Sequence, residues 1–145
     1  MLSADFREFL QLLNDNEVEY LLVGGYAVGY YGYPRYTGDL DIWVRSSKEN
    51  AERLMHVLKQ FGFGSLDITA EDFTKQYAVI QLGHPPLRID LVTTLDGVEF
   101  DQCYQRRNTQ MLDGISVDFI DLDDLRCNKR ATGRARDLDD LENLR

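Results

Sequence analysis

The stretch "LLVGGYAVGYYGYPRYTGDLDIWV" (residues 21–44) contains the features that decide the fold. It overlaps "VEYLLVGG" (18–25), a β-rich run that ends in two glycines. Helical composition follows until the break between Gly32 and Pro34. Residues 39–45 then alternate between apolar and polar side chains, as a half-buried strand does. The stretch therefore predicts a strand, a glycine turn, a short helix and a second strand.

The remaining sequence predicts further helices and strands around this unit. Helices are expected at 3–16, 46–63 and 99–107, strands at 77–83, 87–94 and 115–122, and two short helices near the C-terminus. The strands at 77–83 and 87–94 are separated by "HPP" and should form an antiparallel hairpin. The expected fold class is α+β, with a mixed, largely antiparallel sheet flanked by helices. We expect one domain over residues 1–145, with a helical C-terminal segment at about 121–145.

Composition limits the classes of function. A chain of 145 residues is long enough for one hydrophobic core. Its net charge of −9 argues against broad binding of nucleic acids, which needs Lys and Arg to neutralise phosphates. No apolar run is long enough to span a bilayer, and the acidic start lacks the pattern of a signal peptide, so we expect a cytoplasmic protein without membrane contact. Cys103 and Cys127 have no partners for a zinc site or a disulfide framework.

Asp39 and Asp41 are two residues apart in a predicted strand and so share one face of it. Two carboxylates on one face repel each other, and a divalent metal ion between them would relieve the repulsion. Asp90 is equally unexpected inside the apolar strand "LRIDLVTT" (87–94), where Arg88 shares its face. If the two strands are neighbours, Asp90 completes a carboxylate triad. The alternative is three unrelated acids on the wet face of an antiparallel sheet.

The tripeptide Asp-Leu-Asp occurs twice more, at 121–123 and 137–139. In both places the first Asp stands where a helix N-cap belongs, and the apolar stripe of a helix begins with the next Leu. Acidic residues in a first helical turn also complement the helix dipole. Capping is therefore the expected role of Asp121, and it is the first interpretation of Asp137.

With these residues assembled, the sequence resembles the nucleotidyltransferase superfamily that includes DNA polymerase beta. The resemblance covers the run from Val23 to Val44 together with Asp90 in "RIDLV". It implies the polymerase beta-like fold and two Mg²⁺ ions, or Mn²⁺ in their place. The metal ligands and catalytic residues would be Asp39, Asp41 and Asp90, with Asp90 also able to accept the proton of the attacking hydroxyl. The residues implied to bind the triphosphate are Gly24, Gly25, Arg35 and Thr37.

The sequence is more closely similar to small bacterial members, namely AbiEii-type toxins and minimal nucleotidyltransferases. Its end, "KRATGRARDLDDLENL" (129–144), is similar to a pattern of Lys, Arg and Arg-x-x-Asp in AbiEii-like members. The resemblance implies that Lys129 binds phosphate and that Asp137 also belongs to the site.

The function expected from the resemblance is transfer of a nucleotide from a nucleoside triphosphate to a hydroxyl of an unidentified acceptor. RNA such as tRNA, a protein or a small molecule would each serve, and a toxin–antitoxin or phage-defence system is the expected setting. The alternative is a catalytically degenerate module that binds nucleotides or a toxin–antitoxin partner. Because 145 residues leave little room for a substrate domain, a protein partner or a homodimer would have to complete the acceptor site.

Overall fold

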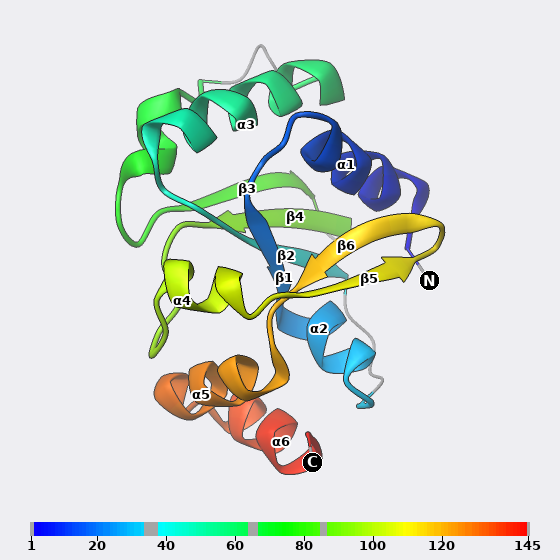
Figure 1. Cartoon of the computed structure of the whole chain (residues 1–145), viewed down its shortest axis with the longest axis vertical. Helices are drawn as coiled ribbons and strands as arrows, with labels where there is room; N and C mark the ends of the chain where they lie inside the picture. Colours follow the sequence, from blue (N-terminus) through cyan, green and yellow to red (C-terminus); the bar gives the residue numbers. More distant parts are fainter. Residues whose placement is uncertain (1, 34–37, 64–66, 85–86, 145) are drawn as a thin grey trace.

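The computed structural model describes residues 2–33, 38–63, 67–84 and 87–144. These residues form one mixed sheet with helices on both sides (Figure 1). The strands are β1 (Tyr20–Val23), β2 (Asp39–Val44), β3 (Val79–His84), β4 (Leu87–Val92), β5 (Asn108–Leu112) and β6 (Ile115–Phe119). The helices are α1 (Ala4–Asp15), α2 (Gly24–Tyr30), α3 (Lys48–Phe61), the 3-10 helix η1 (Ala70–Thr74), α4 (Phe100–Gln105), α5 (Leu122–Thr132) and α6 (Ala135–Asn143).

The strands lie in the order β3-β4-β2-β1-β6-β5. Within the described sheet, the pairs β3/β4, β2/β1 and β6/β5 are antiparallel, whereas β4/β2 and β1/β6 are parallel. In the view of Figure 1, α1 and α3 lie above the sheet and α2, α5 and α6 lie below it. The predicted α+β class and the mixed, largely antiparallel sheet are therefore confirmed.

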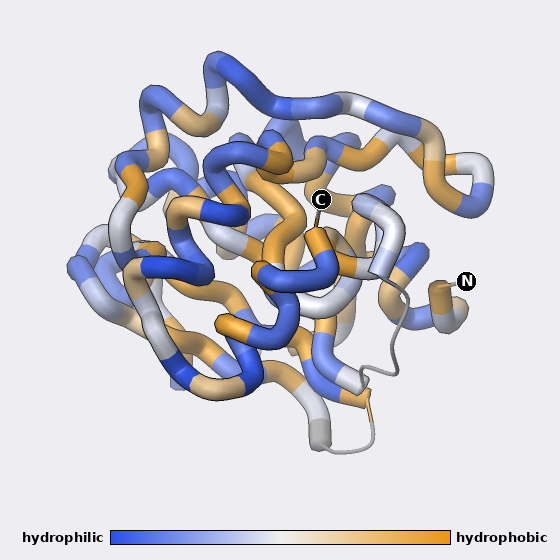
Figure 2. Tube along the Cα trace, turned by 90° about the horizontal axis from the view of Figure 1, so that it is seen from below, coloured by the Kyte–Doolittle hydropathy of each residue, from blue (hydrophilic) through white to orange (hydrophobic). Residues whose placement is uncertain are grey.

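Apolar stripes hold the helices to the sheet. The stripe predicted for the first helix, made of Phe6, Phe9, Leu10 and Leu13, is buried, and the Ser3 side chain caps α1 by accepting from the backbone N–H of Phe6. All four residues of β1 are buried as well. Figure 2, seen from the side of α5 and α6, shows mainly apolar strand segments in the centre and helices of alternating character around them. None of the helices in the described parts of the chain combines the length and apolar character that a membrane span needs.

Several predicted boundaries differ from the structure, and one strand was not predicted. The run 18–25 is a strand only over β1, because Gly24 and Gly25 already form the first turn of α2. The sequence interpretation also missed β5, which forms a hairpin with β6. A signal for it was present: Asp113 and Gly114 form a two-residue turn with φ of 50° and 82°, the combination that Asp-Gly favours between paired strands.

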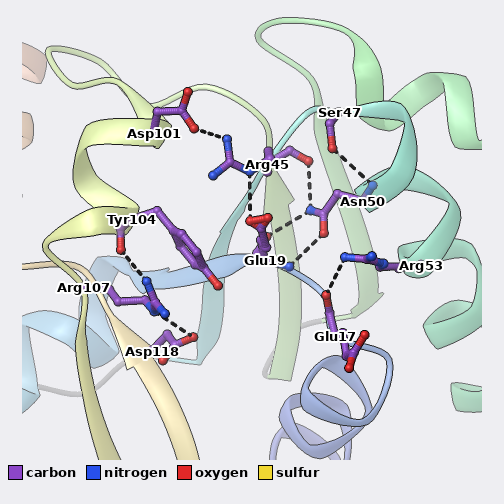
Figure 3. Close-up of polar contacts among 10 residues, drawn as sticks. All are labelled: Glu17, Glu19, Arg45, Ser47, Asn50, Arg53, Asp101, Tyr104, Arg107 and Asp118. Atoms are coloured by element: carbon purple, nitrogen blue, oxygen red, sulfur yellow. Dashed lines mark hydrogen bonds and ion pairs between the residues drawn. The ribbon is translucent and has the colours of Figure 1, made fainter.

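A polar network fixes the far end of β1 and β2 (Figure 3). Asn50 of α3 is buried; its amide donates to the carbonyls of Glu19 and Arg45 at 3.0 and 2.9 Å and accepts from the N–H of Glu19 at 2.8 Å. The guanidinium of Arg45 pairs with the carboxylates of Glu19 and Asp101. These contacts hold α3 and α4 against the strand that carries Asp39 and Asp41.

Replacing Asn50 tests this network. Asn50→Ala leaves three part-buried backbone groups without their partner, so the free energy of unfolding in urea should fall by about 2 kcal/mol. Glu52→Ala, on an exposed position of the same helix, is the matched control and should change it by less than about 0.5 kcal/mol. Equal effects of the two substitutions would contradict a structural role for Asn50.

Candidate functional site

The carboxylates predicted on two strands meet because β2 and β4 are parallel neighbours. Asp41 lies opposite Asp90 in the register, and Asp39 lies opposite Arg88. The apolar residues that alternate with the acids, such as Leu40 and Ile42, are buried on the other face of β2. The two strands are therefore neighbours, as a carboxylate triad requires, and they are parallel rather than antiparallel.

Arg88 lies between the carboxylates. Its Nε donates to Asp90 Oδ1 at 2.8 Å, and its Nη2 donates to Asp90 Oδ2 at 3.0 Å and to Asp39 Oδ2 at 3.1 Å. The sequence interpretation placed Arg88 on the same face as Asp90 but did not see that its guanidinium supplies the positive charge that the acids need. A basic residue two positions before a strand carboxylate was the available signal.

The surroundings of Asp41 perturb its acid–base behaviour. Burial, together with repulsion from Asp90 and Asp39, raises its pKa from 3.8 to about 6, although Lys129 favours the charged form. A carboxylate in this environment is destabilised until more positive charge arrives. The site thus favours binding of a cation next to Asp41.

Gly24 makes room for Asp41. Its φ is +68°, and a Cβ on it would lie 2.2 Å from Asp41 Oδ2 and 2.9 Å from Asp41 Cβ. Only a residue without a side chain allows the backbone at the start of α2 to approach the carboxylate this closely. This contact explains why position 24 has to be glycine, which the sequence motif alone does not explain.

A cavity of about 430 Å³ opens beside these groups. It is lined by six of the residues predicted from sequence: Gly24, Gly25, Asp39, Asp41, Lys129 and Asp137. Asp90 is not in the described lining but pairs with Asp41 across the two strands. Arg134 and Arg136 add positive charge to the same cavity. The cavity is therefore lined both by carboxylates from the sheet and by cationic side chains of the C-terminal segment.

Lys129 is buried in an ion-pair network, with 6% of its surface exposed. Its Nζ lies 3.1 Å from Asp137 Oδ1 and 3.1 Å from Asp140 Oδ2. Asp137 Oδ2 also accepts from Thr132 Oγ1 at 2.6 Å and from Arg134 Nε at 2.7 Å. These contacts lower the pKa of Asp137 to about 2 despite its burial.

The capping interpretation of Asp137 is wrong. Helix α6 begins at Ala135 after Arg134, so Asp137 lies within its first turn and its side chain points to Lys129 instead. Asp121, by contrast, caps α5 as predicted, since its carboxylate accepts from the N–H groups of Asp123 and Asp124. Sequence reasoning also missed Asp140, whose burial to 1% exposure follows from its pairing with Lys129. Arg35 and Thr37, the other predicted phosphate ligands, lie outside the described residues.

In the described parts of the chain, no group of three or more Asp, Glu, His or Cys side chains is arranged to hold a metal ion. The chemistry of the donor set nevertheless fits magnesium, which prefers hard carboxylate oxygens. Asp39 and Asp41 share one face of β2, and burial among other acids destabilises the charged form of Asp41. The residues that would hold the metal are therefore Asp39 and Asp41, with Asp90 beside them.

Comparison with known families agrees with this geometry. Residues 2–145 match a family described as "nucleotidyl transferase of unknown function (DUF2204)". The chain belongs to this family of nucleotidyltransferases. No curated protein matches the sequence.

Solved structures of nucleotidyltransferases share the fold of this chain. One is a candidate nucleotidyltransferase from Thermotoga maritima, with a TM-score of 0.64 and 13% identity over 94% of this chain and 88% of the other. A second is the lincosamide antibiotic adenylyltransferase LnuA, bound to lincomycin, with a TM-score of 0.60 and 13% identity over 99% and 96% of the two chains. A third is an antigenic nucleotidyltransferase-like protein from Paracoccidioides brasiliensis, with a TM-score of 0.54 and 19% identity over 99% and 75%.

Adding one methyl group at Gly24 tests the contact with Asp41. Gly24→Ala should lower the free energy of unfolding by at least about 2 kcal/mol, because its Cβ would overlap the carboxylate and its φ is strained for alanine. Gly29→Ala in the same helix is the control: nothing lies within 4 Å of its Cβ position, so it should be neutral or slightly stabilising. Urea unfolding of both variants measures the difference, and equal stabilities would argue against close packing at Gly24.

The ion-pair network of Asp137 predicts a pH dependence of stability. Since its pKa is lowered in the folded state, its contribution is complete above pH 3.8 and is lost as the pH falls towards about 2. The loss should reach about 2 kcal/mol, and it should be absent in Asp137→Asn. Asp139→Asn, at an exposed position of the same helix, should retain the loss. Urea unfolding of the three proteins is measured from about pH 5 to about pH 2, the range in which Asp137 becomes protonated first in the unfolded and then in the folded state.

Proposed function

We propose that the protein transfers a nucleoside monophosphate from a nucleoside triphosphate to a hydroxyl group, with Mg²⁺ or Mn²⁺ held by Asp39 and Asp41 near Asp90. The observation that carries this proposal is one cavity lined both by the carboxylates of Asp39 and Asp41 and by the cations Lys129, Arg134 and Arg136. That combination matches a metal-bound triphosphate, whose reacting end needs a metal and whose remaining phosphates need positive charge. The bound metal would supply electrostatic stabilisation of the reacting phosphate oxygens.

Each residue has a role that follows from its position. Gly24 and Gly25 bring backbone N–H groups to the cavity wall, where they can donate to phosphate oxygens. Lys129, Arg134 and Arg136 face the same space from the C-terminal helices and neutralise the phosphates. Arg35 and Thr37 remain proposed phosphate ligands on the strength of the sequence resemblance alone. Asp90 is the proposed proton acceptor for the attacking hydroxyl.

A second candidate function is a nucleotide-binding or partner-binding module without transferase activity. The observation that favours it is Arg88, which already neutralises Asp39 and Asp90. For catalysis, the guanidinium has to release at least one of these carboxylates when a metal binds. Our proposal has further parts that rest on the sequence alone. They are a cytoplasmic location, a toxin–antitoxin or phage-defence setting, and a protein partner or second copy that completes the acceptor site.

Titration calorimetry with ATP, CTP, GTP and UTP in the presence of Mg²⁺ tests the site. Asp41→Asn keeps the shape of the side chain but removes its charge, so nucleotide affinity should fall by at least about tenfold. Asp5→Asn, on the exposed surface of α1, is the control and should bind as the wild type does. Nucleotide binding that does not depend on Asp41 would contradict the proposed active site.

A second measurement separates the transferase from the binding module. The protein is incubated with each α-labelled triphosphate and a cell lysate, and the labelled fraction is identified. Label in a macromolecule or small molecule that Asp41→Asn abolishes supports nucleotidyl transfer. Binding of nucleotide without any labelled product supports the module instead.

A further inference from the structure

Arg88 is bound unequally by the two carboxylates on either side of it. Asp90 accepts two bonds, from Nε to Oδ1 at 2.8 Å and from Nη2 to Oδ2 at 3.0 Å. Asp39 accepts a single bond from Nη2, at 3.1 Å. A guanidinium that makes two parallel bonds to one carboxylate is held more strongly and in a more definite orientation than one that makes a single bond. The contact with Asp39 is therefore the weaker of the two.

Exposure separates the two contacts further. The side chain of Asp39 is 41% exposed, whereas that of Asp90 is 11% exposed. Water screens the pair with Asp39 and can replace the guanidinium at its oxygen. Asp90 without Arg88 would be a nearly buried charge that has lost its partner. Breaking the contact with Asp39 is thus much less unfavourable than breaking the pair with Asp90.

The sheet also leaves Arg88 room to move away from Asp39. In the strand register, Arg88 lies between Asp39 of β2 and Gly83 of β3, the outermost strand on that side of the described sheet. Gly83 is exposed, and among the described residues only backbone atoms of Leu87 and Arg88 lie within 4 Å of its Cβ position. A guanidinium that leaves Asp39 can therefore turn towards a position of the sheet that has no side chain.

We propose that Arg88 is a resident counter-ion of this site, which gives up Asp39 to an incoming metal ion and keeps its two bonds to Asp90. The inference rests on the proposed function and adds a positioning residue to it. Asp39, once released, shares one face of β2 with Asp41, and these two residues would hold the metal. A carboxylate has about four lone-pair sites, so the two bonds with Arg88 leave Asp90 able to contact the metal or to accept a proton.

The exchange limits how tightly a metal ion binds on its own. In the metal-free protein, Arg88 competes for Asp39 and repels a second cation placed beside it. A neighbouring guanidinium lowers the affinity of a carboxylate for a proton by about ten- to thousandfold, and a metal ion meets the same competition. The negative charge of a triphosphate offsets the repulsion between Arg88 and the metal. We therefore expect weak binding of metal alone and tighter binding of metal together with a triphosphate.

Titration with Mn²⁺ alone measures the competition, with the unbound ion followed by electron paramagnetic resonance. Arg88→Met removes the charge and keeps an unbranched side chain, so it should bind Mn²⁺ at least about tenfold more tightly than the wild type. Arg7→Met removes the same charge from an exposed position on α1 and should bind Mn²⁺ within about twofold of the wild type. Equal or weaker binding by Arg88→Met would overturn the proposal, and weaker binding is what a purely structural role predicts.

A double variant assigns the gain to this site. Since Asp41 is a proposed ligand, Arg88→Met combined with Asp41→Asn should lose the tighter binding of Mn²⁺. A gain that survives Asp41→Asn would place the ion elsewhere and would contradict the proposal.

Urea unfolding extends the test to a variant that is poorly folded without metal. Arg88→Met leaves the carboxylates without their guanidinium, so its urea midpoint should be lower than that of the wild type. A ligand stabilises the state that binds it, so Mn²⁺ should raise the midpoint of Arg88→Met more than that of the wild type. An equal or smaller rise would overturn the proposal.

Nitrogen-15 NMR of the wild type tests which carboxylate Arg88 releases. Its Nε donates to Asp90, whereas its Nη2 donates to both acids. The Nε–H signal is assigned by its absence in Arg88→Met. At saturating Mg²⁺ its exchange with water should stay within about threefold of the metal-free rate, because the bond to Asp90 persists. Faster exchange than this would show that Arg88 leaves Asp90, and would overturn the proposal.

These measurements and the nucleotide titration fail separately. If triphosphate binding depends on Asp41 but Arg88→Met binds Mn²⁺ no more tightly than the wild type, only the role of Arg88 is wrong. If no triphosphate binds, the proposed function fails, and the Mn²⁺ titration still decides whether Arg88 competes with a metal for the carboxylates.

Discussion

Repulsion between carboxylates on two adjacent parallel strands is the constraint on which the site depends. The register of β2 and β4 sets Asp41 opposite Asp90, and the alternation of β2 sets Asp39 on the same face as Asp41. Charges of one sign at this spacing are unfavourable in a partly buried place unless cations accompany them. The acids therefore depend on the cationic side chains around them.

Neighbouring residues reduce this repulsion in two ways. Arg88 neutralises Asp39 and Asp90 directly, while the charge of Lys129 on α5 favours ionised Asp41. Lys129 is itself balanced by Asp137 and Asp140, so its charge is held in place by α6 rather than by the sheet. Helix α6 thus contributes to the electrostatics of residues that are almost a hundred positions earlier in the chain.

Sequence alone predicted the parts of the site that depend on local periodicity. The alternation around Asp39 and Asp41, and the unexpected acid at Asp90, follow from strand geometry and needed no tertiary information. The partners of Lys129 could not be predicted in this way, because α6 begins at Ala135, before the start that a cap at Asp137 requires, and only tertiary packing turns that carboxylate towards Lys129. Strand β5 is a different case, since its Asp-Gly turn was visible in the sequence and was overlooked.

The parallel pairing of β1 with β6 has a consequence for how the chain folds. Leu22 pairs with Phe119, and Tyr31 donates to the carbonyl of Ile120 at 2.6 Å, so the middle of the sheet joins segments that are distant in the sequence. Strands that are so far apart in the sequence pair slowly, because the chain loses the entropy of the intervening loop before the contacts form. During synthesis, β1 and β2 emerge long before β6, and a nascent chain therefore exposes an apolar strand edge until its last third is made. The central strands are the part of the molecule most in need of protection from aggregation at that stage.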